Sequence, residues 1–126
     1  QAHAAGVEPS LILSSPYRRA RETAEIAASV CGYKDEIVLS PALEPGGSPE
    51  SVWQEIRAHR DESQILLAGH EPLFSALTAY LLNSPTLVVD FKKGALVRVD
   101  THSFGASPRC VLRWMLTPRI LLSENP

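Results

Sequence analysis

The chain has 126 residues, of which 44% are hydrophobic and 21% are charged, and its formal net charge is −2. This length and composition are typical of one soluble globular domain, and a chain of this size buries roughly two-thirds of its unfolded surface without a metal or a disulfide. The low net charge argues against a nucleic acid partner, and the apolar runs are far shorter than the roughly 20 residues of a membrane-spanning helix.

The first residues give no sign of a targeting segment, because residues 1–9 lack a basic region followed by an apolar stretch. Residues 1–6 resemble the last turns of a helix closed by glycine, so we expect the sequence to be truncated at its N-terminus. Cys31 and Cys110 lie far apart among apolar neighbours and show no metal-ligand spacing. We therefore expect free thiols in the reducing cytoplasm, no metal and no cofactor.

A strand followed directly by a helix is predicted near the start of the chain. Residues 11–13 form a continuous apolar run, which is typical of a buried parallel strand. Ser15 can cap the following helix and Pro16 can take its first position, which predicts a helix over residues 16–31 with Gly32 as its terminator. One face of this helix carries small side chains at Ala20, Thr23, Ala24, Ala27 and Ala28.

After a loop rich in proline and glycine, Ser48 and Pro49 repeat the cap-and-proline signal of Ser15 and Pro16 and predict the start of another helix. A second strand followed by a helix comes after it. Residues 65–68 read as a second buried strand, which runs into Gly69, His70, Glu71 and Pro72. Apolar side chains recur at helical spacing in both helices, at Val52, Trp53 and Ile56 and at Leu73, Leu77, Tyr80 and Leu81.

The last third of the chain is predicted to consist of strands, and Pro118 ends the regular structure. The strands are expected over residues 87–89, 96–100 and 110–115. The loop over residues 103–108 joins the last two strands as a hairpin. Early alternation of strands and helices followed by a hairpin predicts one layered α/β/α domain over residues 1–126, with a mostly parallel sheet and an antiparallel C-terminal hairpin.

Two segments that could carry chemistry, residues 15–19 and 69–72, both follow buried strands, where ligands of such sheets bind. Arg19 falls in the first turn of its helix, whose free N–H groups and positive dipole end favour an anion, and its guanidinium can bind phosphate in a bidentate way. His70 can hydrogen-bond a phosphoryl oxygen or carry a proton. The alternatives stay open: a solvated arginine paired with a helix glutamate, and a structural or exposed histidine.

Two carboxylates near these segments, Glu44 and Glu71, are candidate general acids. Glu44 lies in the loop rich in proline and glycine, and Glu71 follows His70 directly. Either can give a proton to a leaving group from a dry pocket. The alternatives are a solvated loop glutamate and a carboxylate that favours the dipole of the next helix. A serine nucleophile elbow lacks its glycines here, and Lys92-Lys93-Gly94 reverses the order of a P-loop.

Residues 13–24, Leu-Ser-Ser-Pro-Tyr-Arg-Arg-Ala-Arg-Glu-Thr-Ala, resemble the Ser-Pro-x-x-Arg-Ala-x-x-Thr motif of SixA-type phosphohistidine phosphatases. These belong to the histidine phosphatase superfamily, which is phosphoglycerate mutase-like. Residues 68–72, Ala-Gly-His-Glu-Pro, are similar to the family's second-histidine motif. Residues 41–48, 93–96 and 114–118 also resemble SixA-type members in order and spacing. The resemblance therefore covers nearly the whole chain.

The resemblance implies a fold without a large cap domain and a mechanism in which a histidine of an Arg-His-Gly motif attacks phosphorus, after which the phosphoenzyme is hydrolysed. It implies that Arg19 is a phosphate clamp and His70 the second histidine. We also assign Ser15 and Glu71 to substrate binding and Glu44 to proton donation.

The family's Arg-His-Gly motif does not occur in the 126 residues. The resemblance therefore implies that the first central strand, its loop and most of a helix are missing, which is roughly 30 to 40 residues on typical element lengths. We expect the chain alone to be catalytically inactive.

Three functions follow from these observations. The leading hypothesis is a phosphatase that hydrolyses phosphohistidine or another protein phosphomonoester in the complete protein. The second is a non-catalytic domain that binds phosphate or a phosphoprotein, which the absent Arg-His-Gly motivates. The third is a phosphatase of the same superfamily that acts on small phosphate esters. The expected partner is a phosphorylated protein or a phosphate ester, and neither a nucleic acid nor a membrane.

Overall fold

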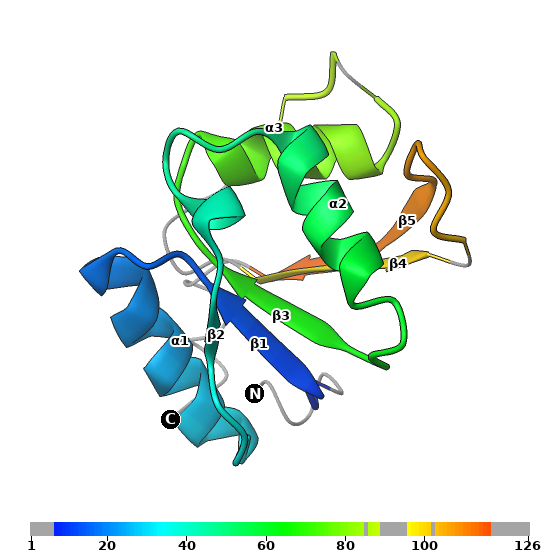
Figure 1. The fold of residues 1–126 in the computed structure, drawn as a ribbon. Coiled ribbons are helices and arrows are strands. Elements are labelled where there is room, and N and C mark those ends of the chain that lie inside the picture. Colours follow the sequence, from blue (N-terminus) through cyan, green and yellow to red (C-terminus); the bar gives the residue numbers. More distant parts are fainter. Residues whose placement is uncertain (1–6, 85, 89–95, 102, 117–126) are drawn as a thin grey trace.

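The computed structural model describes residues 7–84, 86–88, 96–101 and 103–116, arranged as shown in Figure 1. Its helices are α1 (Arg18–Cys31), α2 (Pro49–Ala58), α3 (Leu73–Leu81) and a short 3-10 helix, η1 (Pro41–Leu43). Its strands are β1 (Leu11–Ser14), β2 (Val38–Leu39), β3 (Ile65–Ala68), β4 (Leu96–Thr101) and β5 (Cys110–Leu116).

β1 is the central strand of a parallel sheet whose order is β2-β1-β3. Its four residues pair in register with the four residues of β3, and its last two residues pair with β2. β1 is buried along its whole length, which confirms the buried parallel strand predicted over residues 11–13. Because the three strands are parallel, their carboxyl ends lie at one edge of the sheet.

Alternate residues of β1 pack into two cores, one on each face of the sheet. Leu11 and Leu13 belong to a core that also contains apolar side chains of α2 and α3. Ile12 packs on the other face with Ala24 of α1 and Ala68 of β3. In Figure 1, α1 lies on one side of the sheet and α2 and α3 lie on the other. The predicted α/β/α layering is therefore confirmed.

α1 begins two residues later than the sequence predicts. Pro16 is the predicted first residue, but Tyr17 keeps an extended backbone with φ −66° and ψ 144°, and the helix starts at Arg18. The reason is that Oγ of Ser15 accepts the N–H of Tyr17 at 3.2 Å, so the serine closes a turn ahead of the helix instead of capping it. α1 ends at Gly32, as predicted, in the left-handed conformation with φ 72°.

The elements α2, β3 and α3 begin where the sequence predicts them. Ser48 is the N-cap of α2 and its Oγ accepts the N–H of Ser51 at 3.2 Å, with Pro49 as the first helical residue. β3 occupies the predicted residues 65–68, and α3 starts directly after the Gly-His-Glu-Pro segment. Short-range signals therefore suffice to define these elements.

β4 and β5 form an antiparallel hairpin that is a sheet of its own among the described residues. This confirms the predicted hairpin and its loop. α2 holds the loop, because Nε1–H of Trp53 donates to the carbonyl of Gly105 at 2.9 Å and Nε–H of Arg57 donates to the carbonyl of Phe104 at 2.8 Å. The rings of Trp53 and Phe104 also stack, 5.9 Å apart and inclined by 12°. These contacts attach the hairpin loop to the α2 layer.

The strand predicted directly after α3 is wrong for its two described residues, Leu87 and Val88. The N–H of Leu87 donates to the carbonyl of Ser84 at 2.9 Å, so it closes a turn and is not available to a strand ladder. Val88 is 90% exposed. The predicted features at residues 1–6, 89, 93–95, 117 and 118 lie outside the described residues.

Candidate functional site

The carboxyl ends of β1 and β3 bring Ser15 and His70 into direct contact. Ser14 pairs with Ala68 in the sheet, and the N–H of Ser15 donates to the carbonyl of Ala68 at 2.9 Å. The chain therefore leaves both strands at the same level. Oγ of Ser15 lies 2.8 Å from Nε2 of His70, which is 55 residues further along the chain. The two segments that the sequence singles out thus meet at one place.

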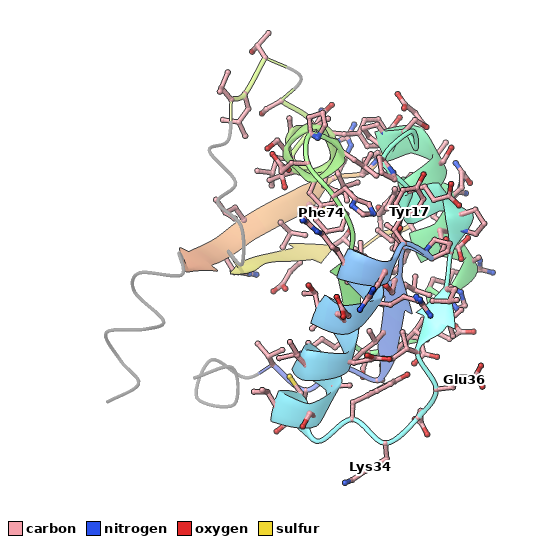
Figure 2. The ribbon with its side chains drawn as sticks, turned by 90° about the vertical axis from the view of Figure 1, so that its left-hand side faces the viewer. Tyr17, Lys34, Glu36 and Phe74 are labelled. Atoms are coloured by element: carbon pink, nitrogen blue, oxygen red, sulfur yellow. The ribbon has the colours of Figure 1, made fainter. Side chains whose placement is uncertain are left out.

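Tyr17 packs against the imidazole, which the sequence does not indicate on its own. The rings of Tyr17 and His70 meet edge-on, with centroids 5.2 Å apart and planes inclined by 69°. The one feature of the sequence that could have indicated this contact is that Tyr17 follows Ser15 by two residues. In a serine turn the N–H of that second residue donates to the serine hydroxyl, as it does here. Figure 2 shows Tyr17 and Phe74 at a similar height near the middle of the molecule, above Lys34 and Glu36 in the loop between α1 and β2.

Gly69 leaves room for Phe74 against the end of β3. A Cβ atom at residue 69 would lie 2.7 Å from Cε1 of Phe74 and 3.2 Å from the carbonyl oxygen of Leu43. The N–H of Phe74 also donates to the carbonyl of His70 at 3.0 Å. A larger residue before His70 would therefore force the Phe74 ring to shift, because α3 and η1 approach the strand end closely.

Arg19 lies in the first turn of α1, two residues after Tyr17, and it is exposed. The side chain of Tyr17 makes no capping hydrogen bond to α1, and the first turn of α1 holds no acidic residue. The free N–H groups at this helix end therefore favour an anion. The neighbouring Arg18 pairs with Glu22, with Nε and Oε2 3.5 Å apart. The alternative predicted from the sequence, a solvated arginine paired with a helix glutamate, therefore applies to Arg18. Arg19 makes no ion pair with another described residue.

The two candidate acids have different surroundings. The carboxylate of Glu71 accepts the backbone N–H of Ser75 at 2.7 Å and also the Ser75 hydroxyl. This is the geometry of the alternative in which Glu71 stabilises the start of α3. Glu44 is half-buried where η1 ends, its N–H donates to Pro41 and its carbonyl accepts the N–H of Gly47. Among the described residues nothing hydrogen-bonds the Glu44 carboxylate, and its catalytic role stays a prediction.

The thiols of Cys31 and Cys110 both have a raised pKa. Burial is the main cause that raises the pKa of both thiols, and the charge of Asp100 raises that of Cys110 further, against a hydrogen bond with Thr101 that lowers it. Both cysteines are free.

In the described part of the chain no cluster of His, Cys, Asp or Glu could hold a metal, and no helix is long and apolar enough to cross a membrane.

A mainly apolar hollow of about 420 Å³ opens beside α3. None of Ser15, Arg19 and His70 contributes to its walls, so it lacks the donors that a phosphate needs. The hollow is lined by Pro49, Pro72, Ser75, Ala76, Ala79, Tyr80, Leu87 and Val88.

Known proteins resemble this chain in structure more clearly than in sequence. No family model matches it, and no curated protein matches it. The solved structure of the protein histidine phosphatase SixA complexed with tungstate matches with a TM-score of 0.80 and 22% sequence identity, covering 95% of this chain and 76% of that chain. The chain has the SixA-type histidine phosphatase fold.

A second structure, that of SixA from Agrobacterium tumefaciens, matches with a TM-score of 0.69 and 21% sequence identity. The match covers 93% of this chain and 73% of that chain. The fold that the motif resemblance implies is thereby confirmed. At these identities the likeness to SixA concerns the fold, and the roles of Arg19, His70, Ser15, Glu44 and Glu71 stay predictions.

Proposed function

We propose that this chain is one part of a phosphatase that hydrolyses phosphohistidine or another phosphomonoester carried by a protein. The observation that carries the proposal is the 2.8 Å contact between Ser15 and His70, which joins both motif segments at the carboxyl edge of a SixA-type sheet. Ligands of parallel sheets bind at this edge. The tungstate in the related structure is a tetrahedral oxyanion, as phosphate is, which supports an oxyanion as the ligand here.

In this proposal Arg19 and His70 hold the phosphoryl oxygens while a histidine nitrogen attacks phosphorus. The nitrogen–phosphorus bond forms as the bond to the leaving group breaks, and Glu44 is the candidate donor of the proton that the leaving group takes up. Water then attacks the phosphohistidine, which releases inorganic phosphate and the free histidine. Positive donors at the site stabilise the charge that spreads over the phosphoryl oxygens.

None of the four histidines among the 126 residues stands in an Arg-His-Gly motif, so the proposal assigns the attacking histidine to residues beyond them. We propose that the chain on its own binds oxyanions and does not turn over. Activity requires residues beyond these 126 that supply the histidine and its neighbouring arginine. The chain would then contribute one side of the phosphate site.

The test compares the 126-residue chain with the product of the whole reading frame that encodes it. We expect the whole product to release phosphate from a phosphohistidine protein and to form a phosphoenzyme that is labile in acid, and the 126 residues to do neither. Hydrolysis of p-nitrophenyl phosphate but not of phosphohistidine protein would favour a phosphatase of small esters. A whole product without an Arg-His-Gly strand would overturn the enzyme proposal.

The absence of Arg-His-Gly favours one other function, a non-catalytic domain that binds phosphate or a phosphoprotein. In that case Arg19 and His70 bind the phosphoryl group without forming a covalent bond to it. Titration with inorganic phosphate separates the two functions. Binding by both the 126 residues and the whole product, with no hydrolysis by the latter, would support the binding domain and contradict the phosphatase.

A further inference from the structure

Ser15 lies beneath His70, in a position that a bound substrate does not reach. Its exposed fraction is 0%, and its N–H donates to the carbonyl of Ala68 at 2.9 Å. Its Oγ accepts the N–H of Tyr17 at 3.2 Å and lies 2.8 Å from Nε2 of His70. The hydroxyl is thus engaged entirely with protein groups. Its effect on any ligand must pass through the imidazole.

We propose that Ser15 is a positioning residue that holds Nε2 of His70, so that Nδ1 is the nitrogen offered to a phosphoryl oxygen. This inference rests on the proposed function and deepens it, because it names the atom of His70 that meets the ligand. It also replaces the sequence-based assignment of Ser15 to substrate binding by an indirect role.

The hydroxyl suits this role because it works with both useful protonation states of His70. One lone pair of Oγ is taken by the N–H of Tyr17, which leaves one proton and one lone pair for the imidazole. In the neutral tautomer that the proposal requires, the ring carries its proton on Nδ1 and the hydroxyl donates to Nε2. When the imidazole is charged, the hydroxyl rotates and accepts from Nε2–H. In both states Nδ1 carries a proton that can be donated to an anion.

Tyr17 restrains the same ring from a second direction. Its ring meets the imidazole edge-on at a centroid distance of 5.2 Å, and its N–H is bonded to Ser15. The turn formed by residues 15–17 therefore contacts His70 through a hydroxyl and through an aromatic edge. An imidazole held at Nε2 and along its side has little freedom to exchange the two nitrogens by a ring flip.

The first test reads the tautomer of His70 by nitrogen-15 NMR of the 126-residue chain. Without ligand, the neutral ring should carry its proton on Nδ1. Sodium tungstate should then move the Nδ1 resonance more than the Nε2 resonance. A neutral ring protonated on Nε2, or a larger tungstate shift at Nε2, would overturn the proposal.

The second test uses a matched pair of buried serines. Ser15→Ala removes the hydroxyl that contacts His70, whereas Ser14→Ala removes an equally buried hydroxyl that donates to the carbonyl of Ser15 at 2.8 Å. We expect Ser15→Ala to mix the two tautomers and to weaken tungstate binding by about 10-fold, as loss of a well-oriented hydrogen bond to a charged group does. Ser14→Ala should keep the Nδ1–H tautomer. Equal behaviour of the two variants would contradict the assignment.

The outcomes distinguish this inference from the proposed function. If the chain binds neither tungstate nor phosphate, the proposed function loses its support, while the tautomer of the free protein still decides the role of Ser15. If Ser15→Ala does not fold, the wild-type spectra with and without tungstate decide it instead.

Discussion

The indole Nε1–H of Trp53 donates a hydrogen bond of 2.9 Å to the carbonyl of Gly105, a residue 52 positions further along the chain. Trp53 is almost completely buried, and Arg57 on the same helix bonds the carbonyl of Phe104. The hairpin loop is therefore held by two long-range donors from one face of α2. Substitutions at Trp53 can therefore test how the hairpin is attached to α2.

The first prediction concerns Trp53. Trp53→Ala should lower the free energy of unfolding by about 3–5 kcal/mol, because it removes a large buried side chain. Trp53→Phe keeps an aromatic ring beside Phe104 but loses the hydrogen bond to Gly105, which is worth about 1 kcal/mol. Urea unfolding followed by circular dichroism measures both. A Trp53→Phe variant as stable as the wild type would contradict a separate contribution of the Nε1–H donor.

The second prediction concerns the glycine before His70. Gly69→Ala should cost about 1–3 kcal/mol of stability, because its Cβ would overlap the ring of Phe74 and force it to move. Shortening the opposing side chain should relieve the overlap. In a double-mutant cycle, Gly69→Ala should cost at least about 0.5 kcal/mol less in a Phe74→Leu background. Strict additivity of the two substitutions would rule out this contact as the cause.

The third prediction compares two exposed glycines. Gly32 adopts the left-handed conformation with φ +72°, whereas Gly46 does not. A Cβ at either position would meet no atom within 4 Å. Gly32→Ala should therefore cost about 1–2 kcal/mol from backbone strain alone. Gly46→Ala should stay within about 0.5 kcal/mol of the wild type. A thermal unfolding series settles the comparison, and a neutral Gly32→Ala would remove the argument from backbone strain.

The fourth prediction concerns the two adjacent arginines of α1. Arg19→Ala should weaken tungstate binding by at least about 10-fold, since Arg19 is the proposed phosphate clamp. In the product of the whole reading frame it should lower kcat/KM by about 100-fold or more, as loss of one charge-stabilising donor commonly does. Arg18→Ala is the matched control, because Arg18 already pairs with Glu22 at the surface. A loss of binding in the control as large as in Arg19→Ala would sink the clamp assignment.

The fifth prediction concerns the pH dependence of the thiols. Burial raises the pKa of Cys31 and Cys110, so at a given pH the folded protein holds fewer thiolates than the unfolded chain. The rate of alkylation by iodoacetamide should therefore rise at higher pH in the native protein than in protein unfolded by urea. The single variants Cys31→Ala and Cys110→Ala assign each rate. Coincident pH profiles in native and unfolded protein would contradict the raised pKa values.

Much of the fold is predictable because its signals are local. Ser48 and Pro49 mark the start of α2, and Gly32 marks the end of α1, through the conformations and hydrogen bonds that these residue types favour. The apolar runs of β1 and β3 identify both as strands. The predicted burial holds along the whole of β1, whereas in β3 only Ala68 is fully buried. An apolar run alone does not separate a strand from an exposed turn, which is why the prediction is wrong at Leu87 and Val88.

The site is predictable in its location but not in its contacts. The sequence places residues near Ser15 and His70 at strand ends, and parallel topology then brings them to one edge. It does not reveal that Ser15 is buried against Nε2 of His70, or that Tyr17 lies edge-on to the ring. Those contacts depend on the β1–β3 register, which pairs Leu11 with Ile65, and no short-range pattern encodes that register.

The in-register pairing of β1 with β3 also determines where this protein can change in length. Deleting one residue within Leu11–Ser14 would turn every later side chain of the strand to the opposite face and carry Ser15 away from His70. Insertions in the exposed loop between α1 and β2 leave that register intact. Related chains should therefore differ in the lengths of their loops, while the number of residues from Leu11 to Ser15, and from Ile65 to His70, stays constant through evolution.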